Sequence, residues 1–462
     1  MIGTRAQGDA LLLIARWVLP VRGPAIEHGA VLVSGNRIAA VGRAASLVAE
    51  AGDAKVRDLG DAVLLPGFVN AHSHLELTVM RGLLEEADFR SWITKLTRIK
   101  LERMSHEDLL DSARLGALEA VSAGVTCLAD TCDSGVAVEA IEDAGLRGVV
   151  YQEVFGPDPA QCGESMQSLI GKLERLDAAR SAPDRVRLGV SPHAPFTVSA
   201  QLFEHVADLS IARQLPMAIH AAESEAERAF LRDGSGPFGD RFRERGISWT
   251  PPATSTIAWL ETLGVLAARP LLIHAVQATP DDLVRIANAD ASVVHCPKSN
   301  AKLGHGIAPV REMLARGLRV GLGTDSVASN NLCDMLDEAR SAVMMARAVS
   351  RNADAMSARR AIEMATIGGA EAIGLDSETG SLEPGKRADL CAVSLDGLHA
   401  TPIHDVEAAL VFSCTANDVA LTVVDGVTVY DREAGGATLL DETRLRARLA
   451  EIARVISGST SG

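Results

Sequence analysis

The sequence predicts an α/β protein built on a (β/α)₈ barrel of the TIM type, with a small β-sandwich domain made from both chain ends. Short apolar runs recur along the chain and alternate with longer segments of helical spacing, a pattern typical of buried parallel strands. Each run leads into polar residues, which is where the strands of such a barrel carry functional groups. The two chain ends carry short alternating strands and turns instead.

Eight apolar runs predict the eight barrel strands. The runs are Leu64–Ala71, Gly124–Ala129, Gly148–Tyr151, Arg187–Pro192, Pro216–Ile219, Leu271–Ile273, Ala291–Val294 and Val320–Gly323. Helical spacing is found between them, as in Leu109–Ser122, Ser165–Leu176 and Ala308–Arg316. A doubly wound open sheet is the alternative, but it does not require histidine at so many strand ends, so the barrel is favoured.

The chain ends are expected to form one domain together. Residues 10–62 and 380–432 both contain short strands separated by turns, and chain termini often lie close together. The predicted domains are 1–63, the first part of the small domain; 64–378, the barrel; and 379–462, the second part, with an amphipathic helix over Asp441–Ile456. The connection Ala226–Thr256, which contains Gly and Pro, is expected to be a lid or a binding loop.

Composition limits the class of partner and the compartment. The net charge of −15 over 462 residues argues against a nucleic-acid partner, which normally requires clustered Lys and Arg. No apolar stretch approaches the roughly 18–20 residues of a membrane span, and the run Ala10–Ala15 is too short for a secretory signal. Seven scattered cysteines indicate reduced thiols. A cytoplasmic protein is expected.

Three histidines and an aspartate predict a metal site. His72 and His74 alternate at the end of the first run, so their side chains point the same way. His220 closes the fifth run, and Asp325 follows the eighth. Considered alone, His220 could be a histidine of the core and Asp325 could be the N-cap of a helix. Considered together, the four residues predict a site for one divalent ion. Zn²⁺ is the expected ion, with Fe²⁺ and Mn²⁺ as alternatives. The segment Arg187–Pro195 has no lysine to bridge a second ion.

Six segments carry motifs that resemble those of the amidohydrolase superfamily, in particular its deaminase and chlorohydrolase branch. They are Pro66–His74, Ser191–Thr197, His220–Glu223, His295–Asn300, Gly323–Ser326 and Leu382–Leu390. The resemblance covers nearly the whole chain. Within the branch, the sequence is similar to methylthioadenosine/adenosylhomocysteine deaminases. The segments Tyr151–Phe155, Arg232–Pro237 and Gly264–Pro270 are closer to aminodeoxyfutalosine deaminases of menaquinone biosynthesis.

The resemblance implies hydrolytic deamination of an adenine nucleoside, with aminodeoxyfutalosine as the working hypothesis. In the similar deaminases, the residue matching Glu223 protonates the ring nitrogen, and Asp325 is placed to take a proton from the attacking water. His274 is expected to hold the attacking oxygen or to polarise the site. The alternatives are a helix-start carboxylate for Glu223 and a supporting hydrogen-bond partner for His274. His295 is expected to pack or orient.

The resemblance also implies five substrate-binding residues. His193 resembles a residue that contacts the ribose, Trp92 and Ser329 match binding residues, and Glu102 lies one residue from the ribose-binding Glu of the family. Glu153 is expected to face the substrate, with a buried carboxylate bonded to backbone as the alternative. The substrate-binding arginines of the family have no clear match, so an amino-acid tail on the substrate is not expected.

Other functions remain open at this point. Within the branch, an adenosine or guanine deaminase or a triazine chlorohydrolase would use the same metal ligands. A non-catalytic barrel protein is the alternative from another class, but it should have lost those ligands, and all four are present. The expected partner is a small purine nucleoside, without nucleic acid or membrane. A homodimer is also expected, because similar proteins usually form dimers.

Overall fold

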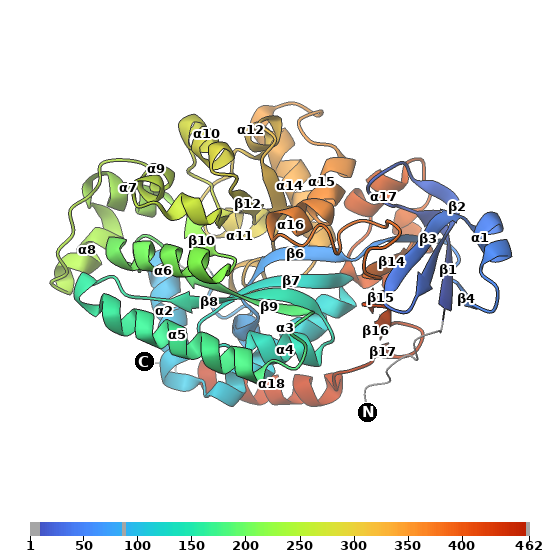
Figure 1. The fold of residues 1–462 in the computed structure, drawn as a ribbon, viewed down its shortest axis with the longest axis horizontal. Coiled ribbons are helices and arrows are strands. Elements are labelled where there is room, and N and C mark those ends of the chain that lie inside the picture. Colours follow the sequence, from blue (N-terminus) through green and yellow to red (C-terminus); the bar gives the residue numbers. More distant parts are fainter. Residues whose placement is uncertain (1–9, 86–88, 459–462) are drawn as a thin grey trace.

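Eight parallel strands lie where the sequence predicts them in the computed structural model of the chain, which describes residues 10–85 and 89–458 (Figure 1). They form two four-stranded sheets, and isolated parallel bridges link the sheets at both edges, between Val190 and Met217 and between Ser73 and Asp325. This is the strand arrangement of a TIM-barrel-type α/β fold; full closure of the barrel stays a prediction. The strands are β6 (Phe68–Ser73), β7 (Val125–Cys132), β8 (Arg147–Val154), β9 (Val186–Pro192), β10 (Ala218–Ala221), β11 (Leu271–His274), β12 (Ser292–His295) and β13 (Arg319–Leu322).

Helices separate these strands. Two segments with helical spacing lie within α3 (His106–Ser122) and α5 (Cys162–Ala179), and the third, Ala308–Arg316, extends beyond both ends of α12 (Val310–Ala315). Helix α3 begins with a capping box in which Ser105 and Asp108 satisfy each other's backbone N–H groups. The other helices of this part are η1 (Leu75–Met80), α2 (Phe89–Arg103), α4 (Ala137–Asp143), η2 (Pro159–Gln161), α6 (Ala200–Arg213), α9 (Thr256–Thr262), η3 (Val265–Ala268), α10 (Pro280–Asn288), α11 (Pro297–Lys302), α13 (Val327–Asn330), α14 (Met335–Ser350), α15 (Ala358–Met364) and α16 (Ile367–Ala372). Among the described helices, none is long and apolar enough to span a membrane.

The first predicted run is two strands in the structure. β5 (Ala62–Pro66) pairs with strands of the small sheet, and β6 begins the parallel set at Phe68. Gly67 separates them, and a Cβ atom there would lie 2.0 Å from the Cγ2 atom of Thr126. The chain therefore passes from one sheet to the other at a glycine because no side chain fits against β7.

Both chain ends form a single nine-stranded sheet, at the opposite end of the molecule from α8 (Figure 1). Strand β5 pairs with β1 on one side and with β14 on the other, which joins the two chain ends directly. The sandwich arrangement and the domain limits stay predictions. The elements are β1 (Ala10–Val18), β2 (Ile26–Ser34), β3 (Arg37–Arg43), α1 (Ala44–Glu50), β4 (Lys55–Asp58), β14 (Leu390–Ser394), η4 (Leu398–Ala400), α17 (Val406–Phe412), η5 (Ala416–Asp418), β15 (Val419–Val424), β16 (Val427–Asp431), β17 (Gly436–Ala437) and the predicted C-terminal helix α18 (Glu442–Ser457).

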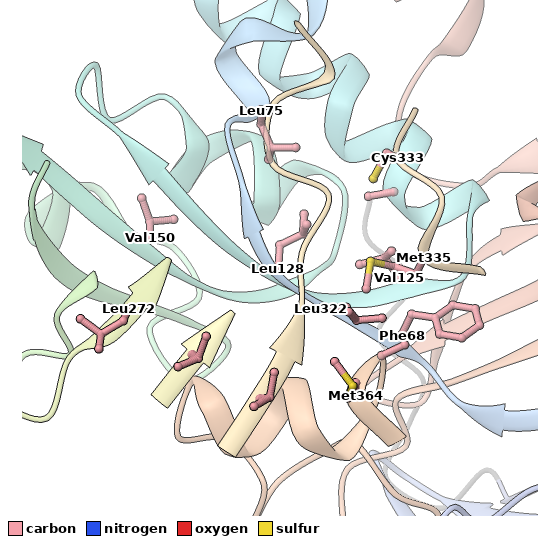
Figure 2. Close-up of a cluster of buried hydrophobic side chains, with 14 of the residues drawn as sticks. Phe68, Leu75, Val125, Leu128, Val150, Leu272, Leu322, Cys333, Met335 and Met364 are labelled. Atoms are coloured by element: carbon pink, nitrogen blue, oxygen red, sulfur yellow. The ribbon is translucent and has the colours of Figure 1, made fainter. Parts of the chain in front are cut away.

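The largest core cluster lies between the parallel strands and the helices around them (Figure 2). Phe68, Leu128 and Leu322 of the strands are buried there with Met335 and Met364 of the helices. All residues of β6, β7 and β8 are buried, including the polar ones at their ends. Burial on both faces explains why these strands read as continuous apolar runs.

A buried ion pair joins β8 to the small sheet, and we expect its loss to lower the free energy of unfolding strongly. Arg147 Nε donates to Asp389 Oδ2 at 2.6 Å, and both side chains are almost fully buried. Arg147→Met leaves the Asp389 carboxylate without this partner and should lower the free energy of unfolding by about 3–5 kcal/mol. Urea denaturation measures this change. The control is Arg16→Met, which removes a half-exposed ion pair with Asp61 and should change the free energy of unfolding by less than about 1 kcal/mol. If the two variants lowered the free energy of unfolding equally, the prediction would be wrong.

The connection after β10 differs from the expected loop. It contains two helices, α7 (Glu225–Asp233) and α8 (Gly236–Glu244). Phe230 of α7 stacks on Trp249 with ring centroids 4.6 Å apart, and the Trp249 indole N–H donates to the Phe230 carbonyl. Aromatic packing therefore orders a segment whose Gly and Pro residues indicate a loop.

Candidate active site

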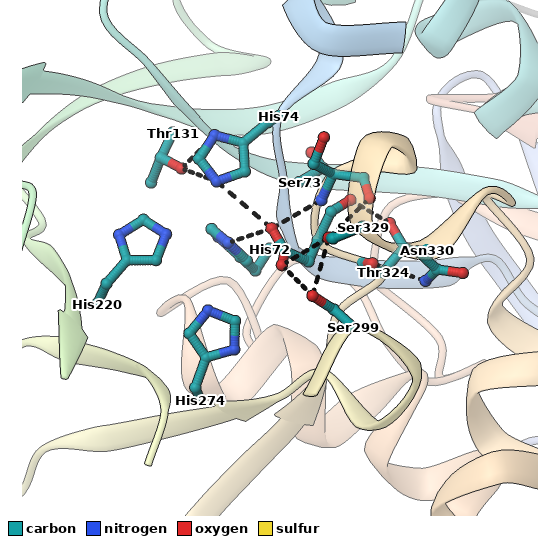
Figure 3. Close-up of polar contacts among 12 residues, drawn as sticks. His72, Ser73, His74, Thr131, His220, His274, Ser299, Thr324, Ser329 and Asn330 are labelled. Atoms are coloured by element: carbon teal, nitrogen blue, oxygen red, sulfur yellow. Dashed lines mark hydrogen bonds and ion pairs between the residues drawn. The ribbon is translucent and has the colours of Figure 1, made fainter. Parts of the chain in front are cut away.

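The four predicted metal ligands converge at the carboxyl ends of the parallel strands. His72 and His74 come from the end of β6, His220 from β10, and Asp325 follows β13. Asp325 Oδ1 lies 3.3 Å from His72 Nε2 and 3.5 Å from His74 Nε2. The ring of His72 lies 5.0 Å from that of His220 between centroids. Figure 3 shows these three imidazoles and that of His274 around one space.

These residues fit a divalent cation. The Nε2 atom of His72 is buried, and its 3.3 Å contact with Asp325 Oδ1 does not have the geometry of a hydrogen bond. Burial and the neighbouring His72 lower the pKa of His74 to about 3, and burial lowers that of His220, so both imidazoles are neutral and keep a lone pair for a metal. Neutral imidazoles around one carboxylate are the donor set that zinc prefers in catalytic sites.

Hydroxyl groups hold the Asp325 carboxylate in place. Ser299 Oγ donates to Asp325 Oδ2 at 2.5 Å, Ser329 Oγ donates to the same oxygen at 3.1 Å, and the Ser326 backbone N–H donates to Oδ1 at 2.7 Å. Asp325 itself has a positive φ of 57°, a strained conformation that is typical of functional positions. Ser329, predicted to bind substrate, therefore holds the Asp325 carboxylate and does not line the cavity.

Glu223 lies beside the metal ligands as a buried carboxylate. Its Oε1 atom is 3.7 Å from His274 Nε2 and 3.2 Å from His305 Nε2. Burial alone would raise the pKa of Glu223, but His274 and His305 outweigh it and lower the pKa. Glu227 accepts the backbone N–H groups of Ala222 and Glu223, which positions the end of β10. The alternative interpretation, in which Glu223 only stabilises the start of helix α7, does not account for its contacts with His274 and His305.

His274 is oriented by a side chain of the next strand end. Its Nδ1 atom lies 2.8 Å from Asn300 Oδ1. An amide oxygen only accepts, so Nδ1 carries the proton, and Nε2 of the neutral ring is left as an acceptor toward the cavity. Burial lowers the pKa of His274 and favours this neutral form. His295, by contrast, is buried away from the cavity lining, as expected for a packing residue.

His305 was not identified from the sequence, and we expect it to position Glu223. It lies between α11 and α12, and its ring meets that of Phe89 edge-on, with centroids 4.6 Å apart. Because contacts to charged groups contribute about 1.5–3 kcal/mol, His305→Ala should lower kcat roughly tenfold or more and leave the metal content and KM near their normal values. His305→Gln, which keeps a donor, should restore part of the loss. A large rise in KM with unchanged kcat would contradict this role.

A cavity of about 530 Å³ opens beside these residues. Trp92, Glu153 and His193 line it, as predicted for substrate-binding residues, together with Glu223, His274 and Asp325. Glu102 does not: it is exposed at the end of α2 and lies outside the lining. The helical turn places Trp92, Leu96 and Lys100 on the buried face of α2 and the Glu102 side chain outside it.

Two lining residues have geometry suited to a polar ligand. The Oε1 atom of Glu153 is buried with no hydrogen-bond partner among the described residues, and burial raises the pKa of this carboxyl group. The backbone-bonded alternative for Glu153 is therefore not supported at Oε1. His193 Nδ1 lies 2.8 Å from Thr197 Oγ1, which fixes the ring. Sequence reasoning missed Lys100, which pairs with Glu76 and Asp133 along one side of the cavity.

Comparisons with known proteins agree with this geometry. The Amidohydrolase family profile matches residues 63–429. The chain is 32% identical to a 5-methylthioadenosine/S-adenosylhomocysteine deaminase of Moorella thermoacetica, over 94% of this chain and 96% of that protein. It is 34% identical to a protein of the same name from Halobacterium salinarum, over 94% and 96%.

Solved structures share the fold. An adenosine deaminase from Xanthomonas campestris with bound zinc has a TM-score of 0.86 and 28% identity, over 98% of this chain and 99% of that one. The aminofutalosine deaminase of Helicobacter pylori has a TM-score of 0.77 and 22% identity, over 90% and 99%, a likeness in fold alone. With the profile match and the strand-end ligands, these relatives establish that the chain belongs to the amidohydrolase family and is a hydrolase.

Proposed function

We propose that this protein is a metal-dependent deaminase that converts the adenine of a purine nucleoside to hypoxanthine and releases ammonia. One observation carries the proposal. Glu223 is buried between His274 and His305 and faces the same cavity as His74, His220 and Asp325, three of the four proposed metal ligands. A carboxylate held there is placed to carry a proton to a ring nitrogen of the substrate. The relatives named deaminases support the same reaction.

We propose one zinc ion on His72, His74, His220 and Asp325. Such an ion supplies a water ligand whose pKa is lowered to about 7. The other steps belong to the chain. His274 Nε2 would accept a hydrogen bond from the attacking water. Glu223 would take one proton of that water and give it to the ring nitrogen next to the carbon under attack, and Asp325 would take the other and give it to the amino group. The C–O bond forms, the C–N bond breaks, and the amino group leaves as ammonia.

The finer substrate proposal is aminodeoxyfutalosine. It rests on the segments Tyr151–Phe155, Arg232–Pro237 and Gly264–Pro270, which resemble those of aminodeoxyfutalosine deaminases, and on a lining that places Glu153 and Phe155 of the first segment in the cavity. Methylthioadenosine is the second candidate, because the relatives over nearly the full chain are named for it. The ribose would lie near His193 and Trp92 in both cases.

Ammonia release by the zinc-loaded protein tests the proposal. The panel is aminodeoxyfutalosine, methylthioadenosine, adenosylhomocysteine, adenosine, guanine and a chlorotriazine, with chloride release measured for the last. The highest kcat/KM is expected for aminodeoxyfutalosine, and hypoxanthine should appear in the product. Release of chloride only, or of ammonia from guanine only, would overturn adenine deamination. A higher kcat/KM for methylthioadenosine than for aminodeoxyfutalosine would overturn the finer substrate proposal but would still support adenine deamination.

A further inference from the structure

The end of β6, where the predicted metal ligands His72 and His74 lie, contains a β-bulge. The strand pairs on either side of it are Asn70 with Leu128 and Ser73 with Asp130. Strand β6 therefore advances by three residues while β7 advances by two, so β6 holds one extra residue. Bulges interrupt the ladder and change the direction of the side chains beside them. The directions of the two imidazoles consequently depend on how the backbone after the bulge is held.

A single carboxylate oxygen of β7 holds the chain on both sides of His74. Asp130 Oδ2 accepts a hydrogen bond from Ser73 Oγ at 2.8 Å and another from the backbone N–H of Leu75 at 2.8 Å. Asp130 is fully buried, so water does not weaken these bonds. The residues before and after His74 are thus tied to one point on the neighbouring strand.

The hydrogen bond to Leu75 takes the place of a helix cap. Helix η1 begins at Leu75, and the first N–H groups of a helix have no partner within the helix. The residue in the cap position usually accepts one of them, but His74 occupies that position and its side chain makes no capping bond. Its ring instead faces the space that it shares with His72 and His220 (Figure 3). Because Asp130 supplies the missing acceptor, the His74 side chain is left for a metal.

Neighbouring strands make further contacts with the same two histidines. Thr131, the residue after Asp130, places Oγ1 3.2 Å from His74 Nδ1 (Figure 3). On the other side of β6, the backbone N–H of Asp325 donates to the His72 carbonyl oxygen at 2.9 Å. These contacts reach the His74 ring and the His72 backbone, whereas those of Asp130 reach the residues that flank His74.

We propose that Asp130 is a positioning residue of the metal site, which directs His74 toward the ion by holding Ser73 and Leu75. Groups that orient metal ligands typically change metal affinity about 10–100-fold when they are removed. The hydrogen bonds and not the charge should matter, because Oδ1 makes no hydrogen bond among the described residues and an amide oxygen can accept in place of Oδ2. The inference rests on the proposed metal site and adds to it a residue outside the ligand set.

The zinc affinity of the full-length protein tests this role, measured on metal-free protein by competition with a chromogenic chelator. Asp130→Ala leaves the Leu75 N–H without its acceptor and should raise the Kd for zinc about 10–100-fold. Asp130→Asn keeps an accepting oxygen and should stay within about threefold of the wild-type Kd, below the effect of an average hydrogen bond.

Asp282→Ala is the matched control. Asp282 is also buried, and it accepts the backbone N–H and the hydroxyl group of Thr279 at the start of α10. Its loss removes hydrogen bonds of the same kind away from the proposed ligands. Asp282→Ala should therefore lower the melting temperature and leave the Kd for zinc unchanged.

The visible spectrum of the cobalt-loaded protein gives a second readout, because it reports how the ligands are arranged around the ion. At saturating Co²⁺, the bands of Asp130→Ala should shift from those of the wild-type protein, and the bands of Asp130→Asn and Asp282→Ala should not. If Asp130→Ala does not fold, Ser73→Ala decides the question. It removes one of the two bonds to Asp130 and should raise the Kd for zinc about two- to tenfold.

The outcomes separate this inference from the metal site on which it rests. A wild-type Kd for zinc and a wild-type cobalt spectrum in Asp130→Ala, or an unchanged Kd in Ser73→Ala where the first variant does not fold, would overturn the positioning role and leave the metal site standing. Equal losses of affinity in Asp130→Asn or in Asp282→Ala would also overturn it, because charge or general stability would then explain the effect. A wild-type protein that binds no zinc would overturn the proposed metal site and this inference together.

Discussion

Glu223→Gln is expected to abolish deamination and to leave the metal bound. The amide has nearly the shape of the carboxylate, but it cannot carry a proton to the ring nitrogen. General acid–base catalysis by a positioned side chain typically contributes about 10²–10⁴-fold, so kcat should fall by at least about a hundredfold. Metal content should stay unchanged, because the carboxylate belongs to none of the three groups of side chains that, within residues 10–85 and 89–458, lie near enough to share an ion. Ammonia release and elemental analysis on the same preparation measure both quantities.

The control for this variant is Glu225→Gln. Glu225 lies two residues further along the chain, is exposed, and pairs with Arg228 on the surface of α7. It should keep normal kcat and KM, since exposed ion pairs contribute little. If Glu223→Gln retained more than a tenth of the activity, the proton-transfer role would fall to another group. If it lost the metal, the carboxylate would have to be counted among the ligands.

The sequence predicted that the four proposed metal ligands lie together, because their pattern follows from the fold. Alternating residues on a strand point to the same side, and the carboxyl ends of parallel strands meet at one face. His72, His74, His220 and Asp325 are therefore brought together by strand register alone. The family resemblance, and not strand register, predicted that Glu153 and His193 contact the substrate; both line the cavity.

Other residues of the site could not be predicted in this way. His305 and Lys100 come from connections between strands, and side chains of connections are placed by tertiary packing, which has no period in the sequence. His305 meets Phe89 across more than 200 positions of the chain. Neither Ser329 nor Glu102 lines the cavity, for a related reason: a match in sequence does not determine which side of a helix faces the cavity.

Removal of the metal is expected to stop ammonia release completely, and one ion per chain should restore it. A ligand that binds only the folded state at a thousand times its Kd adds about 4 kcal/mol to the free energy of unfolding. The melting temperature should therefore fall after chelation and rise again with added Zn²⁺. Asp325→Asn should show the same losses without chelator, because Ser299 and Ser329 would hold a neutral group in place of the charged ligand.

We expect one metal ion per chain, and the reason is the hydrogen bond that His220 makes. Glu153, His193 and His220 are also near enough to share a cation, so two ions are geometrically conceivable. However, His220 Nδ1 lies 3.2 Å from the carbonyl oxygen of His193; a carbonyl only accepts, so Nδ1 carries the proton and Nε2 alone can bind metal. His193→Ala should then keep one zinc per chain and weaken substrate binding. Two ions in the wild-type protein, with one lost in His193→Ala, would show instead that His220 bridges a dinuclear centre.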